Sequence, residues 1–316
     1  MESKVENPAK HEHKPHNTSQ HQQPAGIQKS WYDKYYKILL VIPLILIIAS
    51  LIYIGSFYLK TGDLINRDAS LKGGTTITLP GEVSAEGLEK ALSVKVPDAS
   101  FRSLSELRTG KKIAIVIESS MQPEELKKAV EEVLGYELTE KNSNIEFTGP
   151  TLSKNFYKQL IIALIISFAL MSCVIFIMFR TFTPSIAVIF AAFADIVIPL
   201  AILDYMGVKI SAAGIAAFLM LIGYSVDTNI LLTTRALKKT EGTLNERIYG
   251  AFKTGIFMTS VALVAVLPAF LIVTGLPDSF RQIFLILSIG LFADIVNTWL
   301  TNASIIKWYC DRKGIK

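Results

Sequence analysis

The sequence predicts a polytopic α-helical membrane protein with six transmembrane helices and one external α+β domain between the first and second helices. Three observations support this fold class. Hydrophobic residues make up 51% of the 316 positions and charged residues 19%, and the mean hydropathy is +0.41, outside the usual range of soluble proteins. Six apolar stretches approach or exceed the roughly 20 residues that cross a bilayer. A long polar stretch separates the first from the other five.

The chain divides into five segments in the order of its apolar stretches. Those stretches lie at about 38–59, 160–179, 184–206, 210–234, 255–274 and 281–306. We therefore expect a disordered cytoplasmic tail at 1–30, the first transmembrane helix at 31–60, the external domain at 61–159, a five-helix transmembrane bundle at 160–306 and a second cytoplasmic tail at 307–316.

The distribution of basic residues predicts the orientation. The loop after the fourth apolar stretch carries Arg235, Lys238, Lys239, Arg247 and Lys253. Short loops rich in Lys and Arg stay on the cytoplasmic side. We therefore expect a multi-pass protein of the cell membrane, with both termini inside and residues 60–159 outside. The net charge of +5 then reflects topology, and we expect no nucleic-acid partner.

The external segment alternates between strand and helix patterns. Strand patterns lie at 73–81, 99–107, 112–119 and 143–150, and helix patterns lie at 84–94 and 123–135. Ser84 is the expected N-cap of the first helix, and Gly135 is the expected end of the second. The resulting order, β-α-β-β-α-β, is typical of a ferredoxin-like fold.

The titratable residues of this domain form no catalytic arrangement. The sequence has no carboxylate pair near a histidine there, no phosphate-binding loop and no activated nucleophile. We expect no enzyme activity, no cofactor and no metal site. Cys173 and Cys310 lie in the second and sixth helices, which leaves the external domain without a disulfide framework. All four histidines lie in the N-terminal tail, whose polar composition disorder explains without a metal.

Three aspartates lie at membrane depth and are the main functional candidates. Asp195 is central in the third helix, Asp294 in the sixth, and Asp227 slightly cytoplasmic of the centre of the fourth. Ionisable groups there cost several kcal/mol and usually serve function. We predict ion-coupling roles for Asp227, Asp195, Asp294 and Asn297, with interhelical hydrogen bonding as the alternative. Asp204, at the outer end of its helix, is expected to be solvated.

Helical periodicity places these groups on faces. In a regular sixth helix, one polar stripe contains Asp294, Asn297, Thr298, Thr301 and Asn302. In the fourth helix, Asp227 continues a stripe of small residues, which predicts that it points into a helix interface. Asn229 lies about 200° away around the helix, so both groups cannot face one site.

Three motifs carry a resemblance to a known family. They are "GGT" at the entry of the external domain (Gly73, Gly74 and Thr75), "GP" at its exit (Gly149 and Pro150), and "GYSVDTNILLTTR" in the fourth helix, with Gly223, Asn229 and Arg235 among its positions. With the layout of one helix, one domain and five helices, the chain resembles the SecD/SecF family of protein-export membrane proteins, in its archaeal SecF form. The family is similar to one half of an RND-superfamily transporter. Asp227 followed by Asn229 departs from bacterial SecF, where Asn and Asp are adjacent.

The resemblance implies a function and partners. The family assists the export of secreted proteins, driven by the proton or sodium gradient. The implied partners are a SecD-like sister subunit, a SecYEG-type channel, the translocating polypeptide and membrane lipid. Two alternatives remain open: half of an RND-type exporter of lipids or small molecules, and an assembly subunit without energy coupling. The exporter predicts a pocket or tunnel in larger external domains, and the assembly subunit predicts dispensable aspartates.

Overall fold

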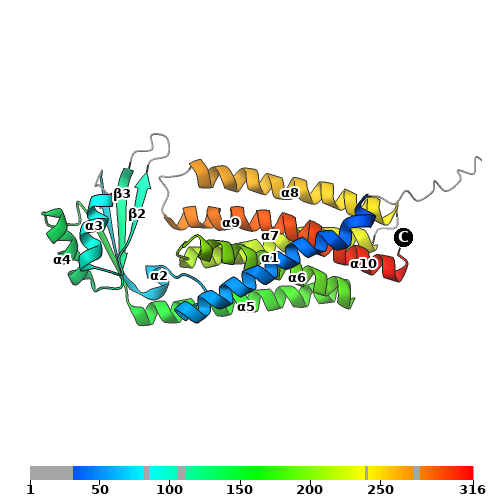
Figure 1. Ribbon diagram of the computed structural model, residues 1–316, viewed down its shortest axis with the longest axis horizontal. Coiled ribbons are helices and arrows are strands. Elements are labelled where there is room, and N and C mark those ends of the chain that lie inside the picture. Colours follow the sequence, from blue (N-terminus) through cyan, green and yellow to red (C-terminus); the bar gives the residue numbers. More distant parts are fainter. Residues whose placement is uncertain (1–30, 82–84, 106–111, 239–240, 273–277, 316) are drawn as a thin grey trace, which may run out of the picture.

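The computed structural model describes residues 31–81, 85–105, 112–238, 241–272 and 278–315. The molecule is elongated, with a bundle of long helices along most of its length and a small sheet carrying two helices at one end (Figure 1). The sheet domain is inserted between the first and second long helices of the chain.

Long apolar helices form the bundle. Their bounds are α1 Trp31–Thr61, α5 Pro150–Phe179, α6 Phe182–Tyr205, α7 Ala212–Lys238, α8 Leu244–Ile272 and α9 Asp278–Val296, which continues through the π-helical segment η1 (Asn297–Asn302) into α10 (Ala303–Lys313). Within the described residues, six spans are long and apolar enough to cross a membrane. The prediction of a six-helix membrane protein is confirmed.

Helices α6, α7 and α9 form the centre of the bundle. Buried residues make up 61% of the apolar window of α6 and 50% of that of α7, but only 6% of that of α5. Small residues bring the central helices close together: a Cβ atom added at Gly290 of α9 would collide with the Leu221 side chain of α7. Side chains on these three helices that point inward therefore share one interior.

The second membrane helix begins earlier than its apolar stretch. Gly149 is its N-cap and Pro150 its first residue, where the missing N–H of proline costs no hydrogen bond. The Ser153 N–H donates to the Gly149 carbonyl at 3.0 Å. Helix α5 therefore extends from the sheet domain directly into the bundle, without an intervening loop.

The sheet domain is a four-stranded antiparallel sheet with two helices. Its elements are α2 Ala69–Lys72, β1 Gly74–Pro80, α3 Ala85–Lys95, β2 Ser100–Ser105, β3 Lys112–Ser119, α4 Pro123–Leu134 and β4 Asn144–Thr148. The strand order is β2-β3-β1-β4, with every pairing antiparallel. This is the arrangement that the predicted β-α-β-β-α-β order produces, and the ferredoxin-like prediction is confirmed.

The core of the domain lies between the sheet and its helices. Ile77, Ile115 and Ile117 alternate along β1 and β3, and pack with Leu92 of α3 and Leu126 of α4 in one buried cluster. Period-two alternation on the strands and a helical apolar stripe on α4 produce this packing. Gly135 ends α4 in the left-handed conformation, as predicted.

Entry and exit of the domain meet at a neck. Gly73 has a φ of 86°, and a Cβ atom there would lie 2.5 Å from the Pro150 Cα. A Cβ atom at Gly74 would collide with the Ser119 carbonyl oxygen. The neighbouring Thr75 donates its hydroxyl to the Met121 carbonyl at 2.7 Å. The predicted need for glycine at the entry is explained by these backbone contacts.

Some expectations concern residues outside the described ranges. They are the N-cap role of Ser84, the N-terminal tail 1–30 with its histidines, and Lys239.

We predict that residues 73–150 fold without the helices, because the described sheet and its two helices bury their own apolar cluster. The isolated fragment should unfold cooperatively, and Ile117→Ala should lower its free energy of unfolding by about 2–5 kcal/mol. Val94→Ala, at an 82% exposed position, is the matched control and should change it by less than about 0.5 kcal/mol. Thermal or urea unfolding followed by circular dichroism measures both. A gradual, noncooperative transition would contradict the prediction.

Candidate functional site

Two of the three membrane aspartates lie together in the centre of the bundle. Asp195 projects from α6 and Asp294 from α9, and each residue is only 1% exposed. The two carboxyl groups are close enough to interact directly. We call them the acid pair. The two aspartates meet because the faces of α6 and α9 that carry them pack toward each other. The sequence of either helix alone does not determine this contact.

Hydroxyl and amide groups surround Asp195. The Ser225 hydroxyl of α7 donates a short hydrogen bond to Asp195 Oδ2, and the Asn297 Nδ2 donates to Asp195 Oδ1 at 2.5 Å. Ser225 and Asn297 are both fully buried. Helix α7 and segment η1 therefore both supply hydrogen-bond donors to the carboxyl group that α6 carries.

Threonines complete the environment of Asp294. The Thr228 hydroxyl lies 3.1 Å from both carboxyl oxygens, and the Thr298 hydroxyl donates to Oδ1 at 3.0 Å. Among the described residues, the hydrogen-bond donors to the acid pair are thus hydroxyls and amides rather than lysines or arginines. A carboxylate can take up a proton, and carboxylate and hydroxyl oxygens are also ligands suited to a hard cation.

The sixth helix departs from the regular geometry expected from the sequence. Residues 297–302 form a π-helix, and the Ala303 N–H donates to the Thr298 carbonyl five residues earlier. The wider turn buries Asn297, Thr298, Thr301 and Asn302, and Trp299 as well. The predicted stripe is therefore present as a buried polar segment, but not with regular α-helical spacing. Single π-helical turns of this kind are frequent at functional sites.

The prediction that Asp227 points into a helix interface is not met between the helices of this chain. Asp227 is exposed on the surface of the bundle, whereas Asn229 is fully buried. The angular separation of the two residues is as predicted, but the faces are exchanged. Larger residues such as Phe218 and Leu221 pack inward, and the small-residue stripe with Gly223 faces outward. Asp227 takes no part in the acid pair.

Asp204 also differs from expectation. It is 4% exposed, and its Oδ1 accepts the backbone N–H of Asn66 at 2.9 Å. The segment that follows α1 runs beside the outer end of α6, where the Ile210 N–H donates to the Asn66 carbonyl. This segment covers the helix end that the sequence alone left open to solvent, and Asp204 anchors it.

Arg235 ties two helices together at the opposite end of the bundle. Its Nη1 donates to the Gly250 carbonyl at 2.6 Å and to the Thr254 hydroxyl at 3.0 Å. It therefore connects the last turns of α7 to the first turns of α8. The prediction that it closes α7 as a basic residue agrees with its place in the last turn.

Sequence reasoning missed the roles of two hydroxyl residues. Ser225 was noted only as part of a motif, and Thr228 was not singled out. Both lie on the inward face of α7, one helical turn apart, beside Asn229. A polar triplet on one face of an apolar helix was the available signal.

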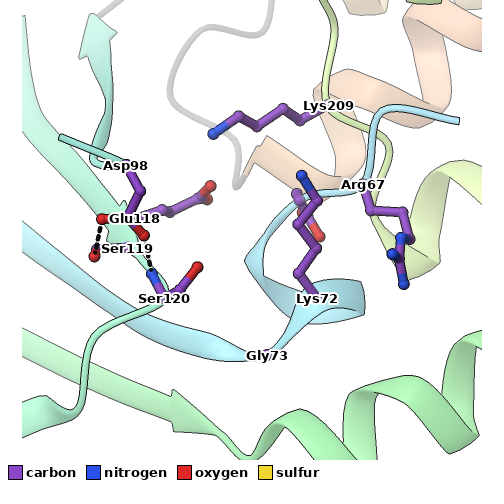
Figure 2. A pocket seen from close by; sticks show the side chains of 9 residues that line it. Arg67, Lys72, Gly73, Asp98, Glu118, Ser119, Ser120 and Lys209 are labelled. Atoms are coloured by element: carbon purple, nitrogen blue, oxygen red, sulfur yellow. Dashed lines mark hydrogen bonds between the residues drawn. The ribbon is translucent and has the colours of Figure 1, made fainter. Parts of the chain in front are cut away.

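A charged pocket lies where the sheet domain meets the end of the bundle that carries the α6–α7 loop. Its volume is about 110 Å³. Figure 2 shows Lys209 reaching from the α6–α7 loop toward the strand that carries Glu118, and Lys72 rising from α2 into the same space. Asp98 lies on the domain side with Glu118. Acids of the domain therefore face Lys209 of the membrane part and Lys72 of α2.

Local hydrogen bonds keep the domain side of this pocket acidic. Asp98 accepts the Ser120 backbone N–H at 2.7 Å and the Ser119 hydroxyl at 2.9 Å. Burial raises the pKa of Asp98, but these hydrogen bonds outweigh it and leave the pKa below its ordinary value. The carboxylate is therefore charged at neutral pH and can attract the lysines opposite.

Comparison with known proteins identifies the family. The family described as "Protein export membrane protein SecD/SecF, C-terminal" matches residues 127–312. A protein-export membrane protein SecF of Methanolacinia petrolearia is 36% identical over 280 residues, covering 88% of this chain and 95% of the relative. That of Methanothermobacter thermautotrophicus is 38% identical over 284 residues, covering 88% and 94%.

The chain belongs to the SecD/SecF family of protein-export membrane proteins. The resemblance predicted from the motifs is thereby confirmed, as is membership of a multi-pass membrane protein family.

Solved SecDF structures share the fold. The crystal structure of SecDF, a translocon-associated membrane protein from Thermus thermophilus, matches with a TM-score of 0.69 at 17% identity, over 88% of this chain and 38% of that chain. SecDF in a super-membrane-facing form matches with a TM-score of 0.55 at 19% identity, over 89% and 39%. This chain therefore spans less than half the length of the SecDF chains it matches.

We predict that the charged pocket orients the sheet domain. Lys209→Glu should broaden the distance distribution between spin labels on Glu140 of the domain and Tyr58 of α1, because one attraction worth about 1 kcal/mol becomes a repulsion. The double variant Lys209→Glu with Glu118→Lys should narrow it again. Electron–electron double resonance measures the distribution.

The matched control for this experiment is Lys141→Glu, which changes the same charge at an exposed position outside the pocket. An equal effect of the control, or no recovery in the double variant, would rule out the orienting role.

Proposed function

We propose that this chain is an accessory subunit of the protein-translocation machinery that works with a SecD-like sister subunit beside a SecYEG-type channel. In this role it assists the export of secreted polypeptides and uses the proton or sodium gradient. The observation that carries the proposal is the acid pair, Asp195 and Asp294, buried together at the centre of a membrane bundle. Membership of the protein-export family supplies the process.

The acid pair supports energy coupling through its chemistry. Two ionised carboxylates side by side in an apolar interior repel each other and lose their hydration. A proton or a sodium ion shared between them removes the repulsion. Movement of one such charge across 100 mV releases about 2.3 kcal/mol, enough to shift a domain between two arrangements. Ser225 and Thr228 of α7 contact the pair, so occupation of the pair can alter how α7 packs against α6 and α9.

The outer face of α7 supports a sister subunit as partner. Ala216, Met220, Gly223 and Asp227 are exposed along this face. Small residues allow another helix to approach closely, and an exposed carboxylate at membrane depth calls for a polar partner. SecDF chains that share the fold are more than twice as long as the matched region, which leaves room for a second half. In this proposal Asp227 faces the sister subunit.

The external domain supplies the contact with the exported chain. It is connected to the bundle at the neck formed by Gly73 and Pro150, and the charged pocket provides a second contact. A domain held in this way can change its orientation when the bundle changes. We propose that this movement assists the polypeptide that emerges from the channel.

The orientation is tested by accessibility. With the basic end of α7 in the cytoplasm, a cysteine at Glu140 should react with a membrane-impermeant thiol reagent added to intact cells, and a cysteine at Lys313 should react only in inside-out vesicles. Both native residues are exposed. The opposite pattern would contradict the proposed orientation.

The coupling role is tested by charge removal. Asp195→Asn and Asp294→Asn keep the side-chain shape and remove the exchangeable charge. Each should reduce gradient-dependent export of a reporter at least about tenfold, a change of about 1.4 kcal/mol in the driving step, while the complex with the sister subunit still assembles. Export with and without an uncoupler is the measurement.

Controls separate coupling from assembly. Glu241→Gln, at an exposed site between α7 and α8, should leave export unchanged. Asp227→Asn should weaken association with the sister subunit if the carboxylate faces it. Normal gradient-dependent export in both acid-pair variants would favour the assembly subunit without energy coupling.

A further inference from the structure

A second pocket, larger than the charged pocket, lies between the sheet domain and the same end of the bundle. Its volume is about 470 Å³, within the range of about 300–1,000 Å³ that is typical of small-molecule sites. Its wall consists of the start of β2, the loop between α6 and α7, the last turn of α8 and the first turns of α9. We call it the junction pocket.

The junction pocket lies at the depth of lipid headgroups. Three of the membrane spans have a limit beside it: two end at Tyr205 and Leu271, and one begins at Phe280. Tyr205 is 78% exposed and its neighbour Met206, which lines the pocket, is 57% exposed. Tyrosines exposed in this way are typical of the interface between membrane and water. The pocket is therefore next to the headgroups of the leaflet on the side of the sheet domain.

The lining of the junction pocket is partly apolar and partly basic. Phe101, Phe270 and Leu285 supply apolar surface, and Lys209 and Arg281 supply positive charge. Among the described residues that line it, none is acidic. This lining suits a molecule with an anionic head and a hydrocarbon part. A free phosphate ion would leave the apolar part of the wall exposed to water.

Gln282 fixes the two basic residues relative to each other. Its Nε2 donates to the Lys209 carbonyl at 2.5 Å, and its Oε1 accepts the Ser211 backbone N–H at 2.9 Å. Because Gln282 directly follows Arg281 on α9, the loop of Lys209 is tied to the turn that carries Arg281. Gly214 makes room for this side chain, since a Cβ atom there would lie 2.7 Å from Gln282 Oε1. The wall is therefore held together by a buried side chain.

Phe270 positions the Arg281 side chain. The guanidinium Cζ lies 5.9 Å from the centre of the Phe270 ring, within the range of a cation–π contact. A guanidinium donates two parallel hydrogen bonds to phosphate oxygens, which a lysine ammonium does not. Lys209 lines both the charged pocket and the junction pocket, whereas Arg281 lines only the junction pocket of these two. Arg281 is therefore the main candidate for recognition of a phosphate there.

We propose that the junction pocket binds an anionic phospholipid from the leaflet on the side of the sheet domain. Arg281 and Lys209 hold the phosphate, and the start of one hydrocarbon chain lies against Phe270 and Leu285. Phe101 belongs to β2 and packs against the core of the domain, so the lipid contacts the domain as well as the bundle. The lipid thereby joins the two parts of the molecule. This role does not depend on ion coupling.

Photo-cross-linking tests the site. The full-length protein is placed in nanodiscs of phosphatidylcholine that contain a minor fraction of phosphatidylglycerol with a photoreactive group at the start of one chain. Mass spectrometry then locates the cross-links, which should fall at 206–209, 270 and 281–285. The double variant Arg281→Gln with Lys209→Gln should reduce them by about tenfold, because both charge-assisted contacts to the phosphate are lost.

Two further variants separate the pocket from general effects of charge and folding. Lys154→Gln with Lys158→Gln is the matched control, because it removes two positive charges at exposed positions in the first turns of α5, outside the pocket. It should change cross-linking by less than about twofold. Val208→Trp keeps every charge and fills the pocket, so it should reduce cross-linking as strongly as the double variant.

Each outcome of the cross-linking decides the proposal. Cross-links in the three segments that are lost in the double variant and in Val208→Trp, but kept in the control, support it. Equal loss in the control means lipid attracted by general charge, and equal cross-linking by a photoreactive phosphatidylcholine means no preference for an anionic head. Loss of cross-linking in excess inorganic phosphate means a site for a free anion, and no cross-links in these segments means no lipid there. Each of these four results overturns the proposal.

Discussion

The cost of placing two carboxyl groups in the apolar interior of a membrane constrains the rest of this structure. Asp195 and Asp294 can lie there only because hydroxyl and amide donors reach them from α7 and the sixth helix. Helix α6, helix α7 and the sixth helix are accordingly the most buried of the bundle, and small residues such as Gly290 let them approach. The outer helices α1, α5 and α8 supply none of these donors and expose most of their apolar residues.

A second constraint acts at the junction between the membrane part and the sheet domain. The chain enters the domain at Gly73 and leaves it at Pro150, and the two backbones are in contact there. The two covalent connections of the domain therefore lie at one point. Opposite charges at Lys209 and Glu118 face each other across the remaining contact. The loop that carries Lys209 joins α6 and α7. A change in the packing of these two helices can therefore move Lys209 relative to the domain.

The sequence was sufficient for the topology and for the chemistry of the site, but not for its assembly. Length and apolarity predict the six spans, and period-two patterns predict the sheet, because both depend on local sequence. The pairing of Asp195 with Asp294 depends on which faces of three helices meet, and the π-helical turn depends on tertiary contacts of Asn297 and Asn302. The small-residue stripe predicts a helix interface at Asp227 but does not distinguish packing within the chain from packing against a second subunit.

The central claim is that the acid pair exchanges a cation with the surrounding solution. Infrared difference spectroscopy of the complex with its sister subunit tests it, because a carboxyl group that gains or loses a proton, or binds sodium, changes its stretching band. The account predicts a carboxyl band that responds to pH or sodium concentration, is altered in Asp195→Asn and Asp294→Asn, and is retained in Glu241→Gln. A response that is the same in all three variants and the unmodified protein would contradict it.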